Sequence, residues 1–89
     1  MNPAESSFYT SAWDQKFKEI LCRHVEKYEE DPERPIKLVD LGLDSLKTLR
    51  LAFDIEETFG ITFPDELMTT RTFETDSSLA KAVRELCGA

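Results

Sequence analysis

Asp44 and Ser45 are the residues whose types and position could do chemistry, because they stand at the start of a helical run that continues to Phe59. The Asp44 carboxylate can cap that helix by accepting hydrogen bonds from its first free backbone N–H groups. Ser45 then occupies the first helical position, where those N–H groups and the positive end of the helix dipole favour an attached anion by roughly 0.3–1 kcal/mol. No base stands nearby in the sequence to activate the hydroxyl. This position therefore suits a phosphodiester attached to Ser45 better than a nucleophilic role.

The other reactive residues of the chain form no catalytic or metal-binding set. His24 is the only histidine, and no Ser/His/Asp arrangement can be assembled around it. Cys22 and Cys87 lack the close spacing of a zinc or redox motif. Cysteines placed this way in a cytosolic helical protein are typically reduced and half buried. We therefore expect no catalytic residue and no metal ligand.

The composition is that of a small acidic domain. The 89 residues suit one domain, and the net charge of −7 argues against nucleic acid, which requires a basic face. An acidic surface favours partners that carry basic patches. No apolar run approaches the roughly 18 residues of a membrane span, and the N-terminus has no signal-peptide pattern. We expect a cytoplasmic monomer, and the two chain ends favour a free-standing protein.

Apolar residues predict a first helix and an ordered loop after it. From Trp13 to Tyr28 they recur at spacings of three and four, which predicts an amphipathic helix of about 18 residues. Pro32 and Pro35 prevent the helix from continuing. We expect the long connection to Asp44 to be ordered, because several apolar side chains can hold it against the bundle. They come from the set Ile36, Leu38, Val39, Leu41 and Leu43.

The helix expected over residues 45–59 has more apolar surface than a bundle helix needs, since a stripe of roughly 100° is enough to face a core. Its apolar side chains form two stripes displaced by roughly 130°. These are Leu51, Ala52, Ile55 and Phe59 and, separately, Leu46, Leu49 and Phe53. Either the helix is buried on most sides, or the second stripe stays partly exposed as a docking surface for other proteins. The small size of the bundle favours docking.

The remaining pattern completes an all-α domain. Gly60 ends the second helix, and Pro64-Asp65-Glu66-Leu67-Met68 predicts a short third one. Thr75 can cap a last helix that extends to about Cys87. The expected fold is a four-helix bundle with three longer helices, one short helix and a long ordered loop between the first two. Residues 11–89 form this domain, and residues 1–10 a flexible N-terminus.

Several segments of the chain resemble the acyl carrier proteins and the related peptidyl carrier proteins. The matching motif is Asp44-Ser45-Leu46 after Asp40-Leu41-Gly42-Leu43, with support from Glu56-Glu57-Thr58-Phe59-Gly60-Ile61 and Phe63-Pro64-Asp65-Glu66. Asp-Ser-Leu alone is a weak motif. Its place at a helix start, within a four-helix pattern of this length, makes the match strong. The likeness covers roughly residues 12–87 and indicates a bundle of the acyl-carrier type.

The resemblance implies that Ser45, beside the helix cap Asp44, carries 4′-phosphopantetheine attached from coenzyme A by a phosphopantetheinyl transferase. The thiol of this arm would hold a cargo as a thioester and carry it between cargo-loading and cargo-processing enzymes, while the protein itself catalyses nothing. Partner enzymes would dock on the helix that follows the serine. The expected docking residues are Leu46, Lys47, Leu49, Arg50, Phe53, Asp54, Glu56 and Glu57.

Lys47 and Arg50 depart from the carriers of fatty acid synthesis, which usually have acids two and five residues after the modified serine. Phe53 also stands where those carriers typically have a smaller or more flexible apolar residue. Reversed charges in a docking face exclude some partners and select others, so we expect a specialised carrier of a polyketide or nonribosomal pathway.

Four interpretations of the function stay open. An acyl carrier fits the residues before Ser45 better than an aminoacyl or peptidyl carrier, for which a Gly-Gly pair before the serine would be typical. A small helical interaction module with an unmodified Ser45 is a remoter alternative, and a serine hydrolase is remoter still. The sequence reveals neither the cargo nor whether the bundle encloses it.

Overall fold

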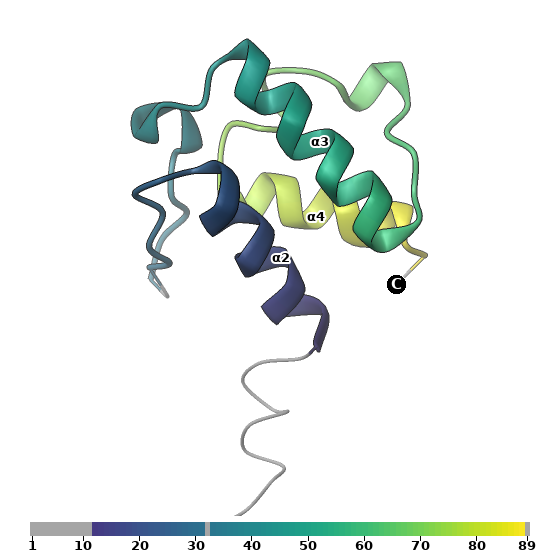
Figure 1. Ribbon diagram of the computed structural model, residues 1–89, viewed down its shortest axis with the longest axis horizontal. Coiled ribbons are helices and arrows are strands. Elements are labelled where there is room, and N and C mark those ends of the chain that lie inside the picture. The colour runs from purple at the N-terminus through teal and green to yellow at the C-terminus, as the bar shows by residue number, and fades with distance from the viewer. Residues whose placement is uncertain (1–11, 32, 89) are drawn as a thin grey trace, which may run out of the picture.

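The computed structural model describes residues 12–31 and 33–88. These residues form three α-helices, α2 (Ala12–His24), α3 (Ser45–Phe59) and α4 (Asp76–Leu86), and two 3₁₀-helices, η1 (Leu38–Leu41) and η2 (Asp65–Leu67), without a strand. The helices α2 and α3 lie side by side, and α4 passes behind them in the view of Figure 1. The predicted all-α fold is confirmed. The expected N-terminal segment over residues 1–10 lies outside the described residues.

The core is built from one apolar stripe of each α-helix. Leu51, Ala52 and Ile55 of α3 are buried, as the periodicity predicts. They pack with Phe17, Ile20 and Leu21 of α2 and with Leu79 and Val83 of α4. Phe63 and Phe73, from the connection between α3 and α4, close the core with their rings 5.5 Å apart. None of the helices in the described ranges is long and apolar enough to cross a membrane.

The first helix is shorter than predicted, because it ends at His24 rather than near Tyr28. Val25 is still buried, but the chain then turns, with the Tyr28 N–H donating to the Val25 carbonyl at 3.1 Å. This turn brings the Tyr28 hydroxyl to Asp76 at the start of α4, where it donates a hydrogen bond of 2.8 Å. Tyr28 therefore reaches the core region from a turn, and its contact with α4 replaces the expected last turn of α2.

The connection between α2 and α3 is ordered, as predicted, and backbone hydrogen bonds hold it to the start of α4. The Leu38 N–H donates to the Glu74 carbonyl at 2.9 Å, and the Asp76 N–H donates to the Ile36 carbonyl at 3.0 Å. Leu38 and Leu43 are buried. Val39 is 58% exposed and therefore does not hold the loop. The tight turn of η1 directs its side chain away from the side that buries Leu38.

Two further expectations are corrected. The short third helix is a single 3₁₀ turn, η2, because the backbone leaves helical geometry at Met68 with ψ 63°. Cys22 and Cys87 are free cysteines, and both are exposed rather than half buried. The last helix begins at Asp76 as expected, with Thr75 and Ser78 forming a reciprocal capping box.

Candidate functional site

Ser45 is the first residue of α3, and its side chain is exposed. Asp44 caps the helix as predicted. Its Oδ1 accepts a hydrogen bond of 2.9 Å from the Lys47 N–H, and its carbonyl accepts from the Thr48 N–H at 2.8 Å. Gly42, with φ +93°, makes the left-handed turn that ends η1 just before this cap. The turn and the cap together place the serine at the surface.

The first turn of α3 has the polarity that favours an attached anion. Within the described ranges, the backbone N–H groups of Ser45 and Leu46 have no acceptor, and the Ser45 hydroxyl makes no hydrogen bond. Both N–H groups belong to the positive end of the helix dipole. An anion on the Ser45 oxygen would therefore lie beside unpaired donors, and nothing in this arrangement turns the hydroxyl into a nucleophile.

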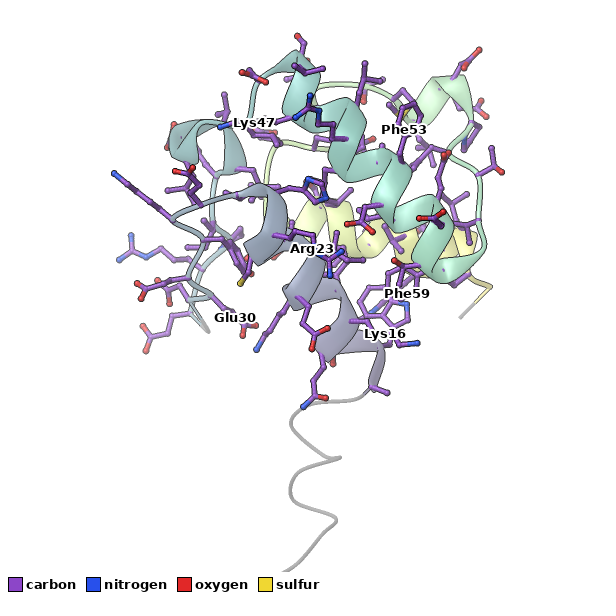
Figure 2. The ribbon with its side chains drawn as sticks, viewed as in Figure 1. Lys16, Arg23, Glu30, Lys47, Phe53 and Phe59 are labelled. Carbon is purple, nitrogen blue, oxygen red and sulfur yellow. The ribbon has the colours of Figure 1, made fainter. Side chains whose placement is uncertain are left out.

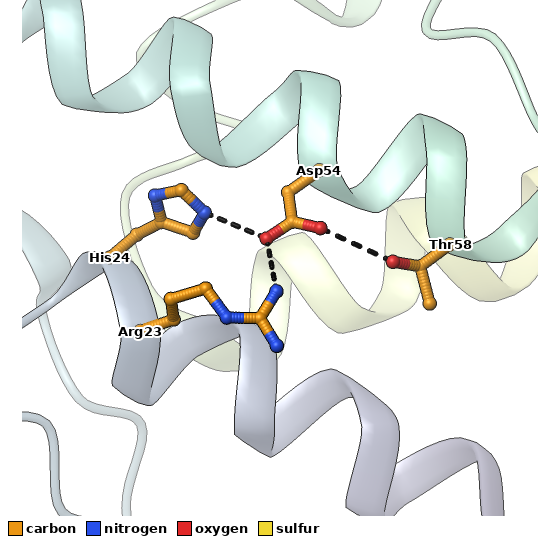
Figure 3. Close-up of polar contacts among 4 residues, drawn as sticks. All are labelled: Arg23, His24, Asp54 and Thr58. Atoms are coloured by element: carbon orange, nitrogen blue, oxygen red, sulfur yellow. Dashed lines mark hydrogen bonds and ion pairs between the residues drawn. The ribbon is translucent and has the colours of Figure 1, made fainter.

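The only histidine is engaged elsewhere, at the junction between α2 and α3. His24 Nε2 lies 2.8 Å from Asp54 Oδ2, the same oxygen accepts from Arg23 at 2.7 Å, and Thr58 donates to Oδ1 at 3.2 Å (Figure 3). Burial alone would raise the pKa of Asp54, but the hydrogen bonds from His24 and Arg23 outweigh it and hold that pKa below its usual range. This cluster joins two helices and supplies no base to Ser45.

The second apolar stripe of α3 is exposed to solvent. Leu46 is 57% exposed, Leu49 44% and Phe53 63%. Phe53 points away from the bundle, whereas Phe59 points toward α2 (Figure 2), where its ring lies 5.3 Å from that of Trp13. The interpretation in which α3 is buried on most sides is therefore wrong, and the helix presents an apolar surface beside Ser45.

The charged residues expected to dock partners do not all face solvent. Lys47, Arg50 and Glu57 are exposed. Asp54 is held by the cluster just described, and Glu56 Oε2 accepts a hydrogen bond of 2.7 Å from the Phe63 N–H. These two carboxylates support the fold, although they stay within reach of solvent, and a docking role for any residue of α3 remains a prediction.

Sequence reasoning missed two residues of this region. Val39, one of the five apolar residues from which the loop anchors were expected, lies exposed on η1 just before the cap of α3. Arg23 of α2 pairs with Asp54. The hydrophobic pattern around Val39 contains no signal of the 3₁₀ turn, and a pairing between residues 31 positions apart leaves no trace in local periodicity.

A cavity of about 270 Å³ lies between α2 and α4, away from the residues around Ser45. Its lining carries ionic side chains, so it offers no apolar chamber for an acyl chain. The lining residues are Trp13, Asp14, Phe17, Lys18, Tyr28, Glu30, Asp76, Ser77, Ala80 and Arg84.

Comparison with known families agrees with this geometry. A family model described as the phosphopantetheine attachment site matches residues 15–86, which is most of the chain and includes all of α3 and α4. The protein belongs to this family of carrier domains, which includes acyl and peptidyl carrier proteins. Its members carry covalently attached 4′-phosphopantetheine and interact with phosphopantetheinyl transferases and pathway enzymes.

Proposed function

We propose that Ser45 is the attachment residue and that this protein is an acyl carrier, which moves a cargo between the enzymes of a biosynthetic pathway. The observation that carries the proposal is the exposed Ser45 hydroxyl at the first position of α3, directly behind the Asp44 cap, in a chain of the carrier family. The prosthetic group, once attached, supplies a thiol that holds the cargo as a thioester. On this proposal the protein is a cytoplasmic monomer that catalyses no step itself.

Each residue around Ser45 has a separate role in this proposal. The Ser45 oxygen bears the phosphodiester, and the N–H groups of Ser45 and Leu46 are free to face its negative charge. Asp44 contributes indirectly, because its hydrogen bond to the Lys47 N–H keeps the first turn of α3 formed. The exposed apolar stripe of α3 then lies next to the attachment point, where a partner enzyme must approach.

Incubation with coenzyme A and a broadly acting phosphopantetheinyl transferase, followed by intact-mass measurement, tests the attachment. The wild-type protein is expected to gain the mass of one arm, and Ser45→Ala to gain none. Ser77→Ala is a matched control, since Ser77 is also an exposed serine in the first turn of an α-helix. Full modification of Ser45→Ala would show that another residue carries the arm and refute Ser45 as the attachment residue. No modification of the wild type would leave the unmodified interaction module as the explanation.

A specialised pathway, polyketide or nonribosomal, is favoured over fatty acid synthesis by Lys47 and Arg50. Both side chains are exposed beside the serine, where they would meet a partner directly. The cargo class is tested by loading the modified protein with acyl-activating and with aminoacyl-activating enzymes and weighing the products. Predominant acyl loading supports an acyl carrier, and predominant aminoacyl loading would assign the protein to the aminoacyl and peptidyl carriers.

A further inference from the structure

The large apolar side chains that are exposed in the described ranges come from two neighbouring elements of the sequence. They are Val39, Leu46, Leu49 and Phe53, between 44% and 63% exposed, and they belong to η1 and α3 on either side of Ser45. Burying one such side chain fully is worth about 1.5–3 kcal/mol, so a partner that covers this group would gain binding energy that the fold itself does not use. The spacing of the α3 members, three and then four residues, is that of a helix prepared to pack against another helix.

The charges along this stripe are separated by position. Lys47 and Arg50 lie in the first two turns of α3 next to Ser45, both exposed and without an ion pair to any residue that the structure describes. Glu57 is exposed two turns beyond Arg50, about 10 Å along the helix axis. That separation exceeds the Debye length of about 8 Å at physiological salt, so Glu57 does little to offset Lys47 and Arg50, although the whole chain carries −7.

Two acidic residues of α3 that could pair with these cations make contacts within the fold instead. Asp54 is held by Arg23 and His24, and Glu56 by the Phe63 N–H. Asp44 lies close by and keeps its charge, but its Oδ1 accepts from the Lys47 backbone N–H, and it forms no ion pair with the Lys47 ammonium in the part of the chain that the structure describes. The cations of α3 are thus available to a partner, in contrast to the basic partners that the net charge alone favours.

We propose that the enzyme which docks on α3 presents an amphipathic helix whose apolar stripe is bordered by Asp or Glu residues opposite Lys47 and Arg50. This inference rests on the proposed carrier function and specifies its partner. The apolar stripe supplies contact area, and the two cations select the partner and its orientation, with the partner's carboxylates toward the Ser45 end.

Two synthetic helical peptides test the charge preference of this surface. Both carry one leucine stripe, flanked by Glu in the first and by Lys in the second. Their binding to the 89-residue protein is measured by calorimetry and by chemical-shift changes at α3. We expect the Glu peptide to bind roughly fivefold more tightly than the Lys peptide, as for two exposed ion pairs, and to lose this advantage at high salt.

Charge reversal supplies the decisive variant. Lys47→Glu combined with Arg50→Glu is expected to invert the preference, and acids near a helix N-terminus keep α3 stable. Lys16→Glu combined with Lys81→Glu is the matched control. Both lysines are exposed on other helices, and the net charge changes by the same amount as in the reversed variant. Lys16 lies far from Lys47 (Figure 2). The control is expected to keep the preference for the Glu peptide.

The inference would be overturned if the wild type bound the Lys peptide as tightly as the Glu peptide or more tightly, or if it bound neither. It would also be overturned if the control variant changed its peptide preference in the same way as the reversed variant. The attachment assay is independent of these peptides. A wild-type protein that takes the arm but shows no preference refutes only the partner, whereas one that takes no arm refutes the carrier function itself.

Discussion

The position of Asp54 on α3 predicts an exposed carboxylate, but its long-range contacts give it a structural role. It belongs to the charged side of α3, yet its side chain is only 17% exposed and contacts Arg23 and His24 of α2. The single Oδ2 atom is shared between two donors from the neighbouring helix. A carboxylate that could have bound a partner therefore fastens α2 to α3.

The lowered pKa of Asp54 gives its contribution a definite pH dependence. Because the pKa is lower in the folded than in the unfolded protein, the carboxylate stabilises the fold above the unfolded value of about 4 and ceases to do so as the pH falls through the folded value. We expect Asp54→Asn to lower the free energy of unfolding by about 1–2 kcal/mol at neutral pH. Urea denaturation should show the gap from wild type closing as the pH is lowered below 4.

Glu57→Gln is the control for this prediction, since Glu57 lies on the same helix but is exposed and forms no ion pair with the residues that the structure describes. It should change stability little at either pH. Equal losses in the two variants would show that the contacts of Asp54 add nothing beyond removal of a charge, and a gap that does not close in acid would contradict the pH dependence assigned to its carboxylate.

At the scale of the element, α3 begins where Asp44 accepts the Lys47 N–H and ends where Gly60 takes a left-handed conformation with φ +67°. Both ends are determined by residues within a few positions of the helix terminus. The start matters most, because the same turn of backbone presents Ser45 and its unpaired N–H groups. A helix that frays there would lose the geometry of the attachment site before it lost the core.

Removing the cap should loosen this turn specifically. Asp44→Ala is expected to cost about 1 kcal/mol of stability and to raise the hydrogen-exchange rate of the Lys47 amide, while amides in the middle of α3 change less. The transferase should also modify Ser45 more slowly in this variant. Asp40→Ala is the control, because Asp40 is exposed on η1 and its side chain caps no helix. Unchanged exchange at Lys47 in Asp44→Ala would contradict the importance of the cap.

At the scale of the whole molecule, Asp76 connects three parts of the chain. It is buried, and its carboxylate accepts hydrogen bonds from the Ile36 N–H at 2.9 Å, the Tyr28 hydroxyl at 2.8 Å and the Ser77 N–H at 2.7 Å. The start of α4 is thereby joined to the turn after α2 and to the segment before η1. Burial and the hydrogen bond to Asp76 also raise the pKa of Tyr28 well above its usual range.

Loss of this carboxylate should affect the entire fold. Asp76→Ala is expected to lower the free energy of unfolding by about 2–4 kcal/mol, because it leaves buried donors without an acceptor. Tyr28→Phe removes one of those donors and should cost about 1 kcal/mol. Thermal unfolding monitored by circular dichroism measures both, with the exposed Asp65→Ala as control. A smaller effect for Asp76→Ala than for Tyr28→Phe would contradict the central role of Asp76.

Much of this molecule could be predicted from local patterns. The bounds of α3, the caps Asp44 and Thr75, the buried stripe around Leu51 and Ile55 and the exposed stripe around Phe53 are all confirmed. Each depends on residues within one or two turns, where hydrogen-bond geometry and helical periodicity suffice. The end of α2 differs from expectation because Tyr28 contacts Asp76 on a distant part of the chain. The exposure of Val39 and the single turn of η2 follow from 3₁₀ turns that hydrophobic periodicity does not reveal.

The amino-acid sequence by itself determined a serine at the start of a capped helix and an apolar stripe next to it, since both follow from neighbours a few residues apart. Only the tertiary structure decided which charges remain on that surface. Asp54 meets Arg23 and His24 through hydrogen bonds that span about thirty residues, and the packing of α2 against α3 creates those contacts. Lys47 and Arg50 find no such partner among the described residues and stay free beside Ser45.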